Sequence, residues 1–126
     1  MKPTIAVDFD GVIHKYSKGW DDGSIYDEPM DGCRDALQKL SETYHILIFS
    51  ARNYDRVVGG ETQSNQVREM EFWLNKYRIP YDEIYTKPAK PLCKLFIDDN
   101  AYRFEGNWSQ CVDDVESLLG RRTNDN

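Results

Sequence analysis

Three short apolar runs in this chain carry or lead into polar side chains at their carboxyl ends. The runs are IAVDF (5–9), ILIF (46–49) and LFI within KLFIDDN, and the polar residues at their ends are Asp8, Asp10, Ser50, Asp98 and Asp99. Short runs rich in β-branched and aromatic residues are typical of buried strands. The sequence therefore predicts a sheet whose strands end in chemically reactive groups.

Between these runs, apolar positions recur three and four residues apart, which is the spacing of a helix with one apolar face. The spacing predicts helices over residues 33–44, 67–77 and 109–119. Ser109 is expected to cap the last helix, whose inward-facing residues are expected to be Val112, Val115, Leu118 and Leu119. A brief strand is expected within residues 82–86. Strands that alternate with helices predict an α/β protein, Rossmann-like, with three layers (α/β/α) around a mainly parallel central sheet.

The chain is long enough for one domain with its own core. We expect this domain over residues 1–120, with residues 121–126 as a frayed tail. Residues 15–29 are predicted to form a short flap, either a loop or a hairpin, and no insertion is long enough for a cap domain. Residues 54–66 are predicted to form a loop, because two adjacent glycines interrupt them.

Composition narrows the class of protein. Cys33, Cys93 and Cys111 form no Cys-x-x-Cys pair, which predicts buried free thiols in a reducing compartment. No apolar run approaches the roughly 20 residues of a membrane span, and the N-terminus lacks the pattern of a signal peptide. We therefore expect a cytoplasmic protein without a membrane partner. The net charge of −6 argues against a chain that holds duplex nucleic acid by neutralising phosphates.

The spacing of Asp8 and Asp10 suggests a reaction. The carboxyl ends of parallel strands share one edge of the sheet, where ligands of open α/β sheets bind. Residues two apart in a strand point to the same side, roughly 7 Å apart. A carboxylate that attacks phosphorus forms an acyl phosphate and replaces one difficult displacement by two easier ones. We expect the charge of Asp8 to raise the proton affinity of Asp10, which suits a general acid, and Gly11 to let the chain turn there.

Asp98 and Asp99 would bring four carboxylates to this edge, together with Asp8 and Asp10. A site of oxygen donors without thiol or imidazole suits Mg²⁺. Because neighbouring residues in a strand point to opposite faces, we expect one residue of the second pair to bind the ion directly and the other to act indirectly.

Other polar residues at the strand ends are expected to hold a phosphate. Ser50 offers a hydroxyl donor, and either Lys87 or Lys90 offers a positive charge. Arg52 has two alternatives, a contact with the substrate or a salt bridge within the protein. His14 is expected to have a structural role, with a place at the entrance of the site as the alternative.

The motifs DFDG, FSAR, a lysine and IDDN occur in this order at the predicted strand ends. In this respect the chain resembles the haloacid dehalogenase (HAD) superfamily of aspartate-nucleophile phosphatases, and most of all its minimal, capless bacterial and phage members. The resemblance implies Asp8 as nucleophile, Asp10 as acid and base, and Asp99 rather than Asp98 as the direct metal ligand, with the carbonyl of Asp10 also bound to the ion. It also implies phosphate clamps and substrate-site residues, which are Ser50, Lys87 or Lys90, Gly11, Ala51 and Arg52.

The expected function is Mg²⁺-dependent hydrolysis of a phosphomonoester through an aspartyl phosphate. The first expected substrate is a nucleotide or another small phosphorylated molecule, and the second is the terminal phosphate of a nucleic-acid end. Two alternatives of another class are a phosphoryl-accepting signalling module and a binding module without turnover. A signalling receiver has its acidic pair first and its phosphorylated aspartate on a later strand, and the order here is the reverse.

Overall fold

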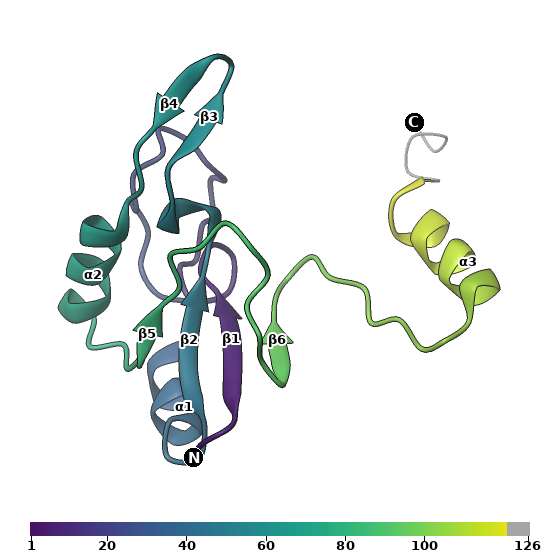
Figure 1. Cartoon of the computed structure of the whole chain (residues 1–126), viewed down its shortest axis with the longest axis horizontal. Helices are drawn as coiled ribbons and strands as arrows, with labels where there is room; N and C mark the ends of the chain where they lie inside the picture. The colour runs from purple at the N-terminus through teal and green to yellow at the C-terminus, as the bar shows by residue number, and fades with distance from the viewer. Residues whose placement is uncertain (121–126) are drawn as a thin grey trace.

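A computed structural model describes residues 1–120, and the predicted frayed tail lies outside the described residues. Four parallel strands form the sheet in the order β5-β2-β1-β6 (Figure 1). The strands are β1 (Thr4–Asp8), β2 (His45–Phe49), β5 (Glu83–Ile84) and β6 (Leu95–Ile97). The predicted α/β class with a parallel central sheet is confirmed.

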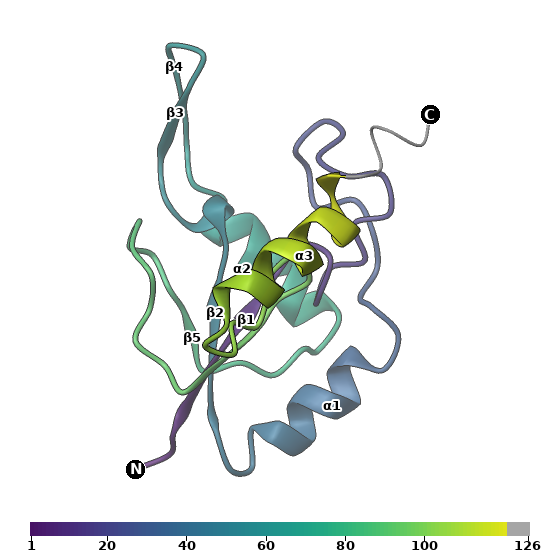
Figure 2. The ribbon, with the colours of Figure 1, turned by 90° about the vertical axis from the view of Figure 1, so that its right-hand side faces the viewer.

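The main hydrophobic cluster lies on one face of this sheet. Alternate residues of β1 and β2, Ile5 with Ile46 and Val7 with Ile48, pair across the two strands and are buried. They pack with side chains from helices α1 (Cys33–Leu40) and α2 (Val67–Lys76), so both helices serve the same face. Figure 2 shows the sheet nearly edge-on, with α1 to one side of it.

Both core helices lie where the apolar spacing predicts them. Leu37 of α1 and Met70, Trp73 and Leu74 of α2 are buried. Each such side chain contributes about 1.5–3 kcal/mol on burial. This packing holds the strands in register and so fixes where the polar residues at their carboxyl ends lie.

A hairpin forms where the sequence predicted a loop. Strands β3 (Arg56–Val58) and β4 (Glu61–Gln63) pair antiparallel. The two glycines between them have φ values of 60° and 82°, and two positive φ values are what a tight two-residue hairpin turn needs. The glycines therefore connect two strands, and the prediction of a loop over 54–66 is wrong there.

Residues 15–29 take the loop form of the two forms predicted for the flap. Within this stretch the described structure has turns and no paired strands. Side chains stabilise the turns: Ser17 donates to Asp27, and the Tyr26 hydroxyl donates to the carbonyl of Gly19 at 2.8 Å. The flap is therefore a loop whose turns are stabilised by polar contacts within it.

The last helix, α3 (Trp108–Leu118), differs from prediction in two respects. Its N-cap is Asn107, whose side chain accepts the N–H of Gln110, and Ser109 lies inside the helix. The residues predicted to face inward are 40–65% exposed: Val112, Val115, Leu118 and Leu119. Figure 1 shows α3 set apart from the sheet at the end of an extended segment. The apolar spacing predicted the helix correctly, but it carries no information on what packs against the apolar face of that helix.

All three cysteines are free thiols, as predicted, but only Cys111 is buried, and Cys33 and Cys93 are partly exposed. Among residues 1–120, no helix has the length and apolar character needed to cross a membrane.

Candidate active site at the carboxyl edge of the sheet

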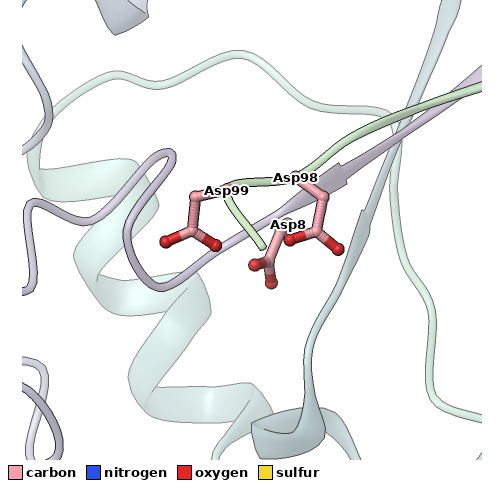
Figure 3. A group of neighbouring side chains, drawn as sticks. All are labelled: Asp8, Asp98 and Asp99. Carbon is pink, nitrogen blue, oxygen red and sulfur yellow. The ribbon is translucent and has the colours of Figure 1, made fainter. Parts of the chain in front are cut away.

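Three carboxylates meet where β1 and β6 end. Asp8 is the last residue of β1, and Asp98 and Asp99 directly follow β6, its hydrogen-bonded neighbour. One carboxylate oxygen of each lies within 4.8 Å of the others. Figure 3 shows the three side chains gathered around one space. The strand ends thus bring together residues that are 90 positions apart in the chain.

Asp98 and Asp99 both reach this space, which differs from the expected division between them. The expectation assumed that both residues lie in the strand, but β6 ends at Ile97. The backbone bends beyond that point, so the alternation of a strand does not apply. Asp98 also accepts the N–H of Asn100 at 3.2 Å, and Asp99 is the more exposed of the two.

Gly11 lies directly against this acidic group. Its φ is +83°, and a Cβ atom at this position would collide with a carboxylate oxygen of Asp99. Both features favour glycine, because other residues rarely adopt this φ and any side chain would displace Asp99. The predicted turn at Gly11 therefore also makes room for the second acidic motif.

The environment of Asp8 favours its neutral form. The pKa of Asp8 is raised from 3.8 to about 7, mainly because burial removes water from the carboxylate. The N–H of Phe9, which donates to it at 2.8 Å, lowers the pKa and offsets part of this effect. The charges of Asp98, Asp99 and Asp10 raise it further. Near neutral pH, Asp8 therefore needs a nearby positive charge to be fully ionised.

Asp10 has the opposite character, which corrects the prediction made for it. His14 Nδ1 lies 2.9 Å from one carboxylate oxygen and Arg52 Nε lies 2.8 Å from the other. Burial raises the pKa of Asp10, but the hydrogen bonds from His14 and Arg52 outweigh it and leave the pKa below its usual value. The spacing in the sequence indicates repulsion from Asp8 but not the contacts with His14 and Arg52.

For Arg52, the structure shows the salt-bridge alternative. The residue is 2% exposed, and its Nη1 donates to the carbonyl of Gly23 at 2.7 Å and to Gln66 Oε1 at 2.6 Å. The ring of Trp20 lies over its guanidinium at 4.6 Å. Arg52 therefore ties the flap to Asp10.

A cleft of about 440 Å³ adjoins the acidic group and shares Asp98 with it. Ser50, Ala51, Lys87 and Lys90 line this cleft, together with the aromatic residues Phe49, Tyr54, Tyr85 and Phe96. The structure therefore places both candidate lysines beside the site, with the ammonium of Lys90 5.0 Å from the centre of the Phe96 ring. Ser50 Oγ accepts the N–H of Arg52 at 3.1 Å, which leaves its hydroxyl hydrogen able to donate to a ligand.

Two contributors were missed from the sequence, the contact of His14 with Asp10 and the role of Gln66. Gln66 accepts from Arg52 and donates to the carbonyl of Gly23 at 2.7 Å. The position of His14, four residues after Asp10 and beyond a glycine turn, was a usable signal. No signal in the sequence pointed to Gln66, because its contacts depend on packing between distant segments.

Fold and site together define an α/β protein with an acidic group at the strand ends and a lysine-bearing cleft beside it. Comparisons of the chain with protein-family models, with curated proteins and with solved structures find no significant match. The case for its function therefore depends on the geometry and on the motifs.

Proposed function

We propose that this protein is a Mg²⁺-dependent phosphomonoester hydrolase of the HAD type, with Asp8 as its nucleophile. The observation that carries the proposal is the meeting of Asp8, Asp98 and Asp99 beside a cleft lined by Ser50 and two lysines. Carboxylates suit a cation and an attack on phosphorus, and lysine and serine suit phosphoryl oxygens. Each half of the site thus complements one part of a metal-bound phosphate.

The donor set fits Mg²⁺. Three carboxylate oxygens within 4.8 Å are hard ligands of the kind that this ion takes, and it usually keeps several waters besides. Burial raises the pKa of Asp8, and the charges of Asp98 and Asp99 raise it further, so a nearby cation would favour its ionised form. When bound, a divalent ion supplies the compensating charge and neutralises charge that develops on the phosphoryl group.

The residues then act in two steps. In the first, a carboxylate oxygen of Asp8 attacks phosphorus, the bond to the leaving oxygen breaks, and that oxygen takes a proton from Asp10. In the second, water attacks phosphorus, gives its proton to Asp10, and the bond to Asp8 breaks with release of phosphate. His14 and Arg52 favour the ionised form of Asp10, which suits the second step. The negative charge of a bound phosphate favours the protonated form that the first step needs.

We propose a small phosphorylated molecule as the substrate, with a nucleotide as the first choice. A cleft of about 440 Å³ accommodates such a molecule, and aromatic rings in its wall suit a flat base. A panel of nucleotides, sugar phosphates and end-phosphorylated oligonucleotides tests this choice. If phosphate is released fastest from the oligonucleotides, the preferred substrate is a nucleic-acid end and not a small molecule.

Release of phosphate from p-nitrophenyl phosphate with Mg²⁺ tests the function itself. Asp8→Asn is expected to lower the rate by on the order of a thousandfold or more. Asp22→Asn is the matched control, because Asp22 stands in another of the chain's three Asp-Gly pairs, is exposed and accepts a hydrogen bond from Ser24. Undiminished hydrolysis by Asp8→Asn would refute the proposal. A stable phosphoprotein without turnover would favour the signalling module instead.

The two lysines are separated by Lys87→Ala and Lys90→Ala. Substitution of the lysine that holds the phosphate is expected to lower kcat/KM by about 10- to 100-fold. Lys94→Ala serves as the control, because its backbone N–H pairs with Thr4 at the other end of the sheet. If neither variant of the cleft lysines differs from this control, the cleft is not the phosphate site.

A further inference from the structure

His14 is a fully buried polar residue in an aromatic environment. Its exposed fraction is 0%, and four rings surround the imidazole with centroids 5.2–5.7 Å away: Phe9, Tyr16, Tyr26 and Trp73. A phenyl ring would suit these surroundings at least as well, since burial of a polar group is unfavourable unless its hydrogen bonds are made. A histidine here therefore calls for an account of its two nitrogens.

The contacts of the two nitrogens determine which one carries the hydrogen. The backbone N–H of Asp27 donates to Nε2 at 3.1 Å, so Nε2 is the unprotonated nitrogen. Nδ1 then carries the hydrogen and donates it to Asp10 at 2.9 Å. The ring is neutral and both nitrogens are satisfied, so the flap at Asp27 fixes the tautomer that Asp10 requires.

A tight turn brings His14 back to Asp10. The N–H groups of Ile13 and His14 both donate to the carbonyl of Phe9 at 2.9 Å, and Gly11 donates to the carbonyl of His14 at 2.8 Å. With Arg52 Nε on its second oxygen, the carboxylate of Asp10 is held from two sides. Both holding groups are buried, so rotation of the carboxylate would leave a buried donor without its hydrogen bond.

We propose that His14 is a positioning residue, which orients the carboxylate of Asp10 for proton transfer to the leaving group and from the attacking water. This role rests on the proposed function, because it needs Asp10 to transfer protons. Proton transfer requires the two heavy atoms to lie within about 2.6–3.2 Å of each other. A carboxylate held only by Arg52 spends part of its time outside that range, and the proton-transfer steps slow accordingly.

Two substitutions separate positioning from packing. His14→Phe keeps a ring in the aromatic environment and removes the hydrogen bond to Asp10. His14→Asn leaves a cavity but places an amide N–H near the position of Nδ1. The matched control is His45→Asn, because His45 lies at the start of β2, at the opposite end of the sheet, and contacts Glu83 on the surface at 3.0 Å.

The measurements are the melting temperature and kcat/KM with phenyl phosphate and with p-nitrophenyl phosphate. Phenolate is the poorer leaving group and depends more on a proton donor. His14→Phe is expected to lose about tenfold in kcat/KM with phenyl phosphate and less with the nitrophenyl ester. His14→Asn is expected to be the less stable variant and yet the more active one.

The outcomes distinguish this role from the proposed function. If the wild-type protein hydrolyses neither ester with Mg²⁺, the proposed function and the positioning role of His14 are both refuted. If the wild type is active but His14→Phe loses the same factor with both esters, or activity follows melting temperature, the positioning role is overturned and the function stands. Nitrogen NMR of the wild type gives a test without turnover. A neutral His14 with its hydrogen on Nδ1 supports the role, and one with its hydrogen on Nε2 refutes it.

Discussion

Asp8→Asn is expected to stabilise the metal-free protein while it abolishes turnover. The pKa of Asp8 is raised from 3.8 to about 7, first by burial and then by the charges of Asp98, Asp99 and Asp10. At 1.36 kcal/mol per unit, a shift of about 3 units corresponds to at most about 4 kcal/mol against the ionised form. Asp8 is only partly buried, and solvent screening reduces this to roughly 1–2 kcal/mol. Asparagine removes that cost, because it carries no charge and still accepts the N–H of Phe9.

The sign of the effect fixes its dependence on pH. Between about pH 4 and 7 the folded protein binds more protons at Asp8 than the unfolded chain does, so the free energy of unfolding falls as the pH rises. The advantage of Asp8→Asn is therefore absent near pH 4 and complete above pH 7. For a chain of 126 residues, 1–2 kcal/mol corresponds to a rise in melting temperature of about 4–8 °C.

Thermal unfolding followed by circular dichroism at pH 8 and pH 4, with EDTA present, measures this difference. Asp10→Asn is an internal control of opposite sign, because hydrogen bonds from His14 and Arg52 hold the pKa of Asp10 below its usual value. This stabilisation is present above the ordinary pKa of an aspartate and lost below it, so Asp10→Asn is expected to melt lower at pH 8. An Asp8→Asn variant that melts at or below the wild-type temperature at pH 8 would refute the electrostatic account.

Three further predictions follow from the same site. Gly11→Ala is expected to weaken Mg²⁺ binding in calorimetry, because the added Cβ displaces the carboxylate of Asp99, whereas Gly19→Ala is expected to leave that binding unchanged. Both glycines have positive φ, but only Gly11 adjoins Asp99, so equal effects would contradict the close approach. Arg52→Gln is expected to lower the free energy of unfolding, measured with denaturant, by about 3 kcal/mol, because it breaks a buried ion pair. Arg56→Gln is expected to lower it by about 0.5 kcal/mol or less, because it loses an exposed hydrogen bond. EDTA is expected to abolish phosphate release and Mg²⁺ to restore it, and full activity in EDTA would exclude a metal requirement.

Periodicity in the sequence was enough to predict the body of the fold. The apolar runs of β1 and β2 and the spacing in α1 and α2 reflect burial, which acts on each segment in a similar way wherever it packs. The β3–β4 hairpin lacks this signal, because its strands are three residues each and largely exposed. In α3 the apolar face was read correctly, but its packing partner is a tertiary property that no local pattern encodes.

The acidic group could be predicted because topology alone creates it. Parallel neighbouring strands end at the same edge, so residues at the carboxyl ends of β1 and β6 lie close together. What the sequence did not disclose is the direction in which Asp98 and Asp99 point. That depends on where β6 ends, and strand ends are among the least reliable features of sequence-based assignment.

The contrast between Asp8 and Asp10 shows why charges within one motif cannot be assigned from spacing. Burial raises the pKa of both carboxyls, and the charge of Asp10 raises that of Asp8 further. The remaining partners decide the outcome: Asp8 faces two further carboxylates, whereas Asp10 accepts hydrogen bonds from His14 and from Arg52, which lies 42 positions away. The uncompensated carboxylate is thus the one that gains most from a bound cation. The compensated one, Asp10, is held in a fixed orientation by His14 and Arg52 without a cation.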